Sequence, residues 1–148
     1  MKAPATRVYD LISDIPNMGA WSPETKRSKW VGGATTAAVG AKFRGTNTRR
    51  MTWRTACEVT AADRGKEFAF VVGRGSTSWN HAFAASDSGC VVTESFTILR
   101  QPGPLGRWLT KLATGVRWSE READLLAGME RTLSNLKVGA EAPAAEVA

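Results

Sequence analysis

The stretch from residue 105 to residue 137 reads LGRWLTKLATGVRWSEREADLLAGMERTLSNLK, and it decides the fold. Its apolar side chains recur at steps of three, four and seven residues, which places them on one face of a helix. They are Leu105, Trp108, Leu109, Leu112, Val116, Ala123, Leu126, Met129, Leu133 and Leu136. The other face carries Arg107, Lys111, Arg117, Arg121, Asp124 and Arg131. This pattern predicts a long amphipathic helix with a buried apolar face and a solvated charged face.

The apolar stripe weakens near its middle. Gly115 lowers the helix propensity there, and Ser119, Glu120 and Glu122 interrupt the apolar spacing. We therefore expect a kink or a polar window in this region. Lys137 and Gly139 favour a helix end close to residue 138.

Length and composition indicate one globular domain. The chain has 148 residues, of which 43% are hydrophobic and 23% are charged, enough apolar material for a proper core. We expect the domain to span residues 1–138. Residues 139–148 are rich in Ala, Pro and Glu, which predicts a disordered tail.

The charge and the cysteine content limit the possible classes of function. The net charge is +6, but Lys and Arg are spread along the whole chain rather than gathered in one run, which does not favour nucleic-acid binding. Cys57 and Cys90 lack metal-ligand spacing, and a single histidine, His81, excludes a His-rich metal site. We expect neither a metal nor a cofactor. No leader and no long apolar run stand out, so we expect a reduced, cytoplasmic protein without a membrane span.

The chain before residue 105 begins with helical spacing and then changes to a period of two. Val8, Leu11, Ile12 and Ile15 predict a short helix that begins near Pro4, and a second short turn follows at residues 17–21. From residue 26 onward, six segments alternate apolar and polar side chains and are separated by turn residues. The order of two short helices, six strands and a long helix predicts an α+β fold, a curved antiparallel sheet wrapped around the C-terminal helix.

Several short segments, in this order and spacing, resemble the START-like or SRPBCC superfamily, specifically its polyketide cyclase/dehydrase-like branch. They are Ala3-Pro4 with Val8-Tyr9-Asp10-Leu11 and Asp14, Trp21-Ser22-Pro23-Glu24, Gly40-Ala41-Lys42-Phe43-Arg44-Gly45, Asn47, Trp53, the Gly89 turn into Val91-Val92-Thr93-Glu94, and Met129-Glu130-Arg131-Thr132-Leu133. The resemblance covers residues 3–137. It implies a helix-grip fold with a deep, largely apolar cavity that binds lipids, sterols, polyketides or similar molecules.

One departure from the family pattern concerns the first strand. Members of the family usually begin with a full β-strand before the Ala-Pro, whereas only Met1 and Lys2 precede it here. Either the strand is absent or the start is assigned too late. An absent strand would leave a sheet edge open to a second chain, so the sequence leaves a homodimer open.

The last predicted hairpin brings two ionisable residues together. If it closes through Ser86-Asp87-Ser88-Gly89, His81 lies directly opposite Glu94, and Trp79 and Phe83 lie opposite Phe96 and Val92 on the same apolar face. Burial among aromatic side chains would perturb both ionisable groups. The pair is a candidate catalytic site, but buried charges are usually paired, which favours two polar groups that satisfy each other.

The inward faces of the strands and the stripe of the long helix supply candidate ligand-binding residues. They are Phe43, Asn47, Arg49, Trp53, Cys57, Phe70, Trp79, Phe83, Phe96, Leu112 and Val116. Such aromatic residues more often fill a core than recognise a ligand, although a core and a cavity wall are built from the same residue types. Glu24, at the Ser22-Pro23 corner, is interpreted as a turn residue.

Three classes of function are compatible with these features. The first is a noncatalytic binder of an apolar small molecule of lipid, polyketide or aromatic type. The second is a cyclase- or dehydratase-like enzyme in which His81 acts as acid or base, Glu94 orients it, and Arg49 or Asn47 polarises a carbonyl. The third is a protein-interaction or regulatory module with a basic surface. A fold alone does not distinguish among them.

Overall fold

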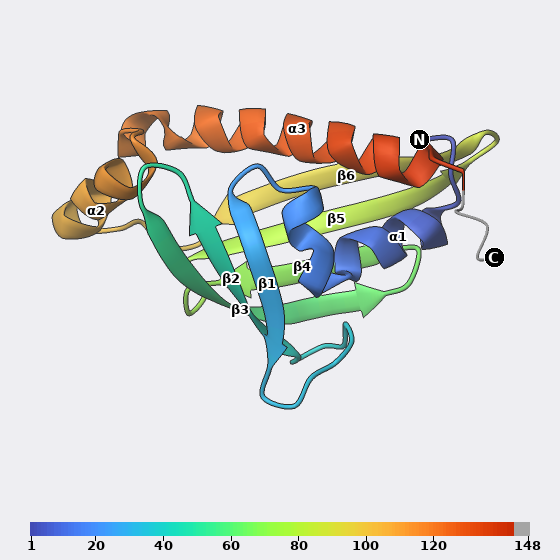
Figure 1. The fold of residues 1–148 in the computed structure, drawn as a ribbon, viewed down its shortest axis with the longest axis horizontal. Helices are drawn as coiled ribbons and strands as arrows, with labels where there is room; N and C mark the ends of the chain where they lie inside the picture. The colour runs from blue at the N-terminus through green and yellow to red at the C-terminus, as the bar shows by residue number, and fades with distance from the viewer. Residues whose placement is uncertain (144–148) are drawn as a thin grey trace.

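Six strands form one antiparallel sheet in strict chain order in the computed structural model, which describes residues 1–143. They are β1 (Thr25–Val31), β2 (Lys42–Thr48), β3 (Thr52–Asp63), β4 (Glu67–Val72), β5 (Thr77–Ser86) and β6 (Gly89–Ile98). The helices are α1 (Ala5–Ser13), the 3-10 helix η1 (Ile15–Ala20), α2 (Pro104–Thr114), the 3-10 helix η2 (Trp118–Glu120) and α3 (Arg121–Glu141). The sheet curves around α3, which crosses its concave side (Figure 1). The predicted helix-grip architecture is confirmed.

The core occupies the end of the molecule where α1 and the last turns of α3 pack against the sheet. Val8 and Ile15 from the N-terminal helices, Phe68 from β4 and Leu136 from α3 are fully buried there. Tyr9 contacts the rings of Phe68 and Phe83 edge-on. This end of the molecule is therefore filled by side chains, and the other end, where α3 begins, is left for the cavity.

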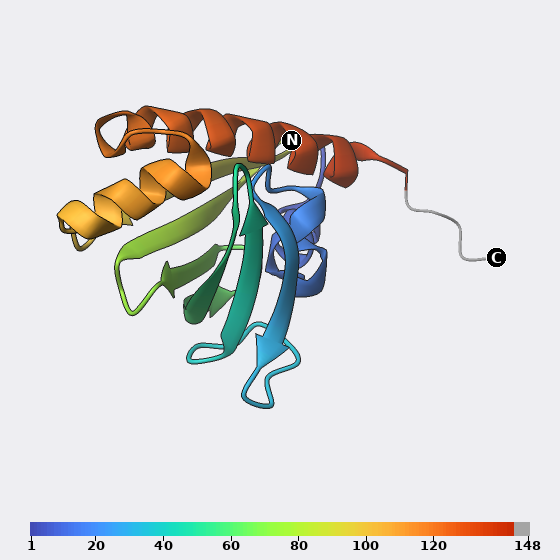
Figure 2. The ribbon, with the colours of Figure 1, turned by 60° about the vertical axis from the view of Figure 1, so that its left-hand side comes forward.

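The predicted helix over residues 105–137 breaks instead of bending. Gly115 adopts a left-handed conformation with φ of 82°, and its N–H bonds to the carbonyl of Lys111 at 2.8 Å, which ends α2. The chain then turns through η2 before α3 begins, and α2 stands out from the end of the molecule (Figure 2). Glycine adopts this backbone conformation without steric cost, and this explains why the interruption is a full break.

The break corrects the prediction of one continuous buried stripe. Met129 and Leu136 on α3 are buried as predicted, but Leu126 on α3 and Leu105, Trp108, Leu109 and Leu112 on α2 are exposed. A helix that restarts after a break need not keep the phase of the one before it, so the two halves turn different faces to the sheet.

The predicted domain end at residue 138 is too early. Helix α3 continues to Glu141, and Ala140 is buried in the core cluster. Of the tail expected over residues 139–148, positions 144–148 lie outside the described residues.

The register of the last hairpin is as the sequence predicts. His81 lies opposite Glu94, Trp79 opposite Phe96, Phe83 opposite Val92, and Ala85 opposite Cys90. No strand precedes α1 in residues 1–143. Met1 instead exchanges two backbone hydrogen bonds with Cys90 near the start of β6, at 2.8 and 3.0 Å. None of the helices in this range is both long and apolar enough to cross a bilayer.

Candidate ligand-binding cavity

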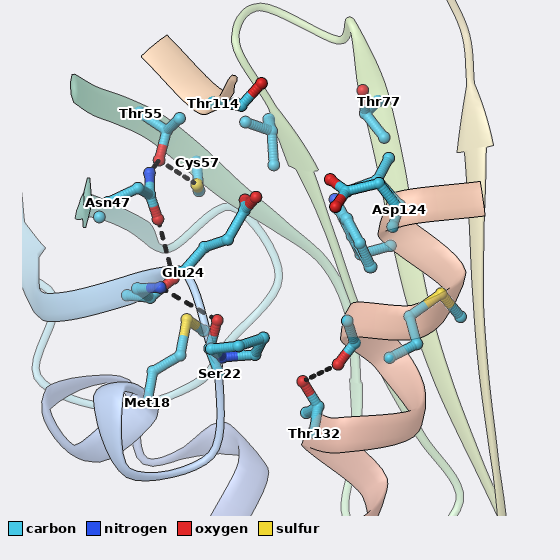
Figure 3. Close-up of a pocket in the computed structure, with 18 of the residues that line it drawn as sticks. Met18, Ser22, Glu24, Asn47, Thr55, Cys57, Thr77, Thr114, Asp124 and Thr132 are labelled. Atoms are coloured by element: carbon cyan, nitrogen blue, oxygen red, sulfur yellow. Dashed lines mark hydrogen bonds between the residues drawn. The ribbon is translucent and has the colours of Figure 1, made fainter. Parts of the chain in front are cut away.

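A cavity of about 560 Å³ lies between the concave face of the sheet and the N-terminal half of α3. Side chains of η1, the start of β1 and the last turns of α2 complete its walls. Figure 3 shows Met18 from η1 and Thr132 from α3 on opposite sides of this space, with Asn47, Thr55 and Cys57 from the sheet behind it. Its volume falls within the usual range for small-molecule sites, about 300–1,000 Å³.

Most of the residues predicted to bind a ligand line this cavity. Those on the walls are Phe43, Asn47, Arg49, Trp53, Cys57, Phe70 and Trp79, and the candidate catalytic residues His81 and Glu94 line the cavity too. Arg49 lies in the turn after β2, and the others come from strands β2 to β6, whose inward faces the alternation identified. The aromatic members form an apolar surface suited to a hydrophobic molecule.

Four predicted residues lie outside the cavity walls. Phe83 packs against Tyr9 in the filled end of the grip, and Phe96 packs against Trp79 and lines a separate open groove beneath α3. Leu112 is on the exposed face of α2, and Val116 is in the turn after Gly115. The break in the predicted helix moved the last two residues away from the sheet.

His81 and Glu94 form a buried pair on the cavity wall. His81 Nε2 lies 3.3 Å from Glu94 Oε1, and each side chain is only 4% exposed. The imidazole ring stacks beside Phe70 and lies tilted to Phe68, so its surroundings are largely apolar. Neither His81 Nδ1 nor Glu94 Oε2 has a hydrogen-bond partner among residues 1–143. Buried polar atoms are usually satisfied, so these two atoms are exceptions.

Asn47 is held by a polar network across three strands. Thr25 donates its hydroxyl to Asn47 Oδ1 at 2.9 Å, and Asn47 Nδ2 donates to Thr55 Oγ1 at 3.2 Å. The amide orientation is therefore set by protein partners. Asn47 gives the cavity a fixed polar spot, but its carbonyl is already occupied.

Four charged residues close the rim of the cavity, and we call them the rim cluster: Glu24, Arg49, Arg121 and Asp124. Arg121 donates to both oxygens of Glu24 at 2.7 and 2.9 Å and also bonds to Asp124. Arg49 donates to Asp124 at 2.6 Å and to Glu24 at 3.2 Å. Figure 3 shows Glu24 and Asp124 reaching into the space from opposite sides.

Contacts within the rim cluster shift the pKa values of Asp124, Arg121 and Arg49 in the directions that keep these three residues charged. Burial opposes the ionisation of Asp124, yet hydrogen bonds from Arg49 and Arg121 hold the pKa of this carboxyl below its ordinary value. Burial also opposes the charge of Arg121, but the contacts with Glu24 and Asp124 raise its pKa. Opposite charges at hydrogen-bond distance thus outweigh the cost of desolvation.

The rim cluster also corrects the prediction for the helix face. The sequence predicts Arg121 and Asp124 on the solvated side, yet both line the cavity. Glu24 lies in the bend before β1, as expected of a turn residue, and lines the cavity as well. After the break at Gly115, the first turn of α3 faces the corner that carries Glu24. The sequence contained one signal for this cluster, which is the spacing of three residues between Arg121 and Asp124. It was not sufficient to predict the cluster, because the partners Glu24 and Arg49 are distant in sequence.

Cys57 adds a buried thiol to the wall. Burial raises the pKa of this thiol to about 11, although a hydrogen bond to Thr55 opposes the shift. A thiol with this pKa remains neutral at physiological pH and is a poor nucleophile. Within residues 1–143, no group of three His, Cys, Asp or Glu side chains is arranged to hold a metal ion.

Comparison with known proteins places this architecture in a family. The profile of the family described as "Polyketide cyclase / dehydrase and lipid transport" matches residues 1–141. The chain belongs to this family. The resemblance to the START-like or SRPBCC superfamily is thereby confirmed. A comparison with curated protein sequences gave no match.

Solved structures of the same fold include polyketide cyclase-like proteins. A polyketide cyclase-like protein from Corynebacterium glutamicum is 27% identical, with a TM-score of 0.50, and the match covers 95% of this chain and 80% of that one. The di-domain aromatase/cyclase StfQ of the steffimycin biosynthetic pathway has a TM-score of 0.71 at 15% identity, covering 95% of this chain and 47% of that one. The AHSA1-like protein from Aeromonas hydrophila has a TM-score of 0.63 at 14% identity, covering 97% and 92%.

Proposed function

We propose that the protein binds an amphipathic small molecule, with an apolar body and at least one polar group, in the cavity between the sheet and α3. The cavity itself is the observation that carries this proposal. Its volume of about 560 Å³ suits a molecule of lipid, polyketide or aromatic type. Phe43, Phe70 and Trp79 would contact the apolar body, and the unpartnered atoms of His81 and Glu94 would bond to a hydroxyl or carbonyl group.

The family supports this choice of ligand class. Its description names polyketide cyclases, dehydrases and lipid transport, and StfQ belongs to a biosynthetic pathway. Polyketides and lipids both combine an extended apolar surface with oxygen-containing groups. The apolar walls and the polar groups of this cavity complement that combination.

The experiment is a binding screen with a variant that fills the cavity. Fatty acids and flat hydroxylated aromatics are added to the purified protein, and the melting temperature and the native mass spectrum are recorded. A ligand that binds only the folded state raises the melting temperature by mass action. Thr132→Phe places a ring in the cavity and should abolish the shift. Ser134→Phe, on the exposed side of the same helix, should keep it.

A second candidate function is catalysis by the His81–Glu94 pair. It is supported by the burial of the pair and by the lack of a hydrogen-bond partner for His81 Nδ1 and Glu94 Oε2. An imidazole next to a carboxylate can act as general acid or base on a substrate within hydrogen-bond distance, about 3 Å. A cyclisation or dehydration of a polyketide requires such proton transfers at carbons next to carbonyl groups. Product formation from a short poly-β-keto thioester, measured by mass spectrometry and lost in Glu94→Gln, would distinguish this function from binding alone.

A further inference from the structure

Helix α2 turns its large apolar side chains toward solvent. Leu105 is 68% exposed, Trp108 58%, Leu109 49% and Leu112 42%. Their spacing of three, four and seven residues places them on one stripe of the helix. The side that faces the protein carries the small residues Gly106, Thr110, Ala113 and the buried Thr114. A helix that packs on a core usually turns its large apolar face inward, whereas α2 turns that face outward.

The orientation of α2 is set by contacts at its C-terminal end. The N–H of Met51, in the turn between β2 and β3, donates to the carbonyl of Ala113 at 3.0 Å. Thr114 donates to the carbonyl of Thr110, and the Arg50 side chain lies directly against Gly115. Because these contacts hold the other side of the helix, the apolar stripe remains on the surface together with the exposed Met51.

The surroundings of this stripe are basic. Residues 99–117 contain Arg100, Arg107, Lys111 and Arg117 and no Asp or Glu. None of these four side chains forms an ion pair with a carboxylate in the described part of the chain. An apolar stripe with Trp and Leu, bordered by uncompensated Lys and Arg, is the composition of helices that lie in the interface of an anionic membrane.

The position of α2 connects this surface to the cavity. Thr110, Ala113 and Thr114 contribute to the cavity wall, and so does Leu109, which is half exposed at the edge of the stripe. A surface that rested on Leu105 and Trp108 would therefore lie next to the opening of the ligand site. Figure 2 shows α2 at the end of the molecule where α3 begins, with no other element outside it.

We propose that the docking surface, defined as α2 together with Arg50 and Met51, binds the surface of an anionic lipid bilayer. Leu105, Trp108 and Leu112 enter the boundary between headgroups and acyl chains, and Arg107 and Lys111 contact the lipid phosphates. A second copy of the chain is a poorer partner, because a twofold contact through this surface would bring its own uncompensated cations together. The docking does not depend on which molecule the cavity holds.

The experiment measures vesicle binding by flotation and tryptophan fluorescence. Wild-type protein should bind vesicles of phosphatidylcholine with about 30% phosphatidylglycerol and should bind pure phosphatidylcholine much more weakly. About 0.5 M NaCl should reduce the binding to anionic vesicles, because salt screens the phosphate contacts. Brominated lipids should quench the fluorescence of Trp108, and Trp108→Leu should remove most of that quenching while vesicle binding persists.

Matched variants make the proposal falsifiable. The double variant Leu105→Ser with Trp108→Ser should weaken binding to anionic vesicles by about tenfold or more, and Arg107→Glu with Lys111→Glu should do the same. The control Val91→Ser with Val138→Ser removes two exposed apolar residues elsewhere and should bind as the wild type does. The melting-temperature shift with a cavity ligand should persist in all three, so failure of docking and failure of ligand binding are told apart.

Three results would overturn the proposal. The first is no binding of wild-type protein to anionic vesicles, and the second is equal binding by the wild type and the α2 variants. The third is a stable dimer in sedimentation equilibrium that the Leu105→Ser and Trp108→Ser changes dissociate, which would assign this surface to a second copy.

Discussion

Arg121 donates hydrogen bonds to both carboxylate oxygens of Glu24, at 2.7 and 2.9 Å. Arg121 is the first residue of α3, and Glu24 is the residue before β1. The two residues are 97 positions apart in the chain. Their contact joins the start of the long helix to the start of the sheet at the mouth of the cavity. Two parallel bonds between a guanidinium and a carboxylate add orientation as well as strength.

The first prediction concerns the stability that this contact provides. Arg121→Met should lower the free energy of unfolding by about 2–4 kcal/mol, because it leaves Glu24 and Asp124 close together without one of their cations in a partly buried site. Urea unfolding at pH 7 measures this change. Arg64→Met is the matched control, since Arg64 binds Asp10 through two similar bonds on the exposed surface, and its loss should be clearly smaller. Equal losses in the two variants would contradict the role of burial.

The second prediction concerns the pH dependence of the rim cluster. The pKa of Asp124 in the folded protein is below its ordinary value of 3.8, so its ionic contacts stabilise the fold fully above that value. This contribution is lost as the pH falls through the lowered pKa. The difference in unfolding free energy between wild type and Asp124→Asn should therefore be constant from pH 7 to about pH 5 and shrink below about pH 4. A difference that stayed unchanged down to the acid limit would show that Asp124 acts without its charge.

The third prediction concerns the His81–Glu94 pair. Each partner has a buried atom without a hydrogen bond, so the pair is incompletely compensated for its burial. Glu94→Gln keeps the shape and removes the charge, and it should leave the melting temperature nearly unchanged while weakening the response to a polar ligand by about tenfold. His81→Gln should behave in the same way.

Thermal melting and ligand titration on the same samples check this third prediction. Glu58→Gln, on the outer face of β3, is the control and should change neither measurement. A large loss of stability with an unchanged ligand response in the folded fraction would assign the pair a structural role alone.

The fourth prediction concerns the thiol of Cys57. A pKa of about 11 instead of 9.0 lowers the thiolate fraction near neutral pH by about 100-fold, and the thiolate is the reactive form. Alkylation of Cys57 by iodoacetamide should be slower than that of a small free thiol by at least this factor. A ligand in the cavity should slow it further. Peptide mass spectrometry resolves Cys57 from Cys90, and rapid alkylation of native Cys57 would show that the wall opens readily.

The fifth prediction compares two glycines of α3. A methyl group at Gly139 would lie 2.6 Å from the Trp21 ring, which is held by a hydrogen bond from its Nε1 to the carbonyl of Leu11. Gly139→Ala should therefore destabilise the protein by about 1–3 kcal/mol. At Gly128 the nearest atom, Cγ of Pro23, is 3.8 Å away, so Gly128→Ala should stabilise by about 0.5–1 kcal/mol through helix propensity. Urea unfolding of both variants tests the contrast, and the same sign for both would refute it.

The alternation of the sequence was sufficient to predict the sheet and part of the site. Side chains on a strand alternate between its faces, and a turn at Ser86-Asp87-Ser88-Gly89 sets the register of the strands that it joins. With the turn at these residues, the sequence predicts His81 opposite Glu94, and the structure has this pairing. Local rules sufficed here because the two strands are neighbours in both sequence and space.

The outward face of α2 and the rim cluster were decided by the tertiary structure. A helical period shows that a stripe exists, but it does not show whether another surface covers it, so the sequence predicts Leu105 and Trp108 to be buried and both are exposed. Similarly, the charge of Arg121 predicts that this side chain is exposed to solvent, as long as its partner Glu24 is unknown. Glu24 approaches it only after the sheet has formed and the chain has broken at Gly115, because two opposite charges can share a buried site only when the fold brings them within hydrogen-bond distance.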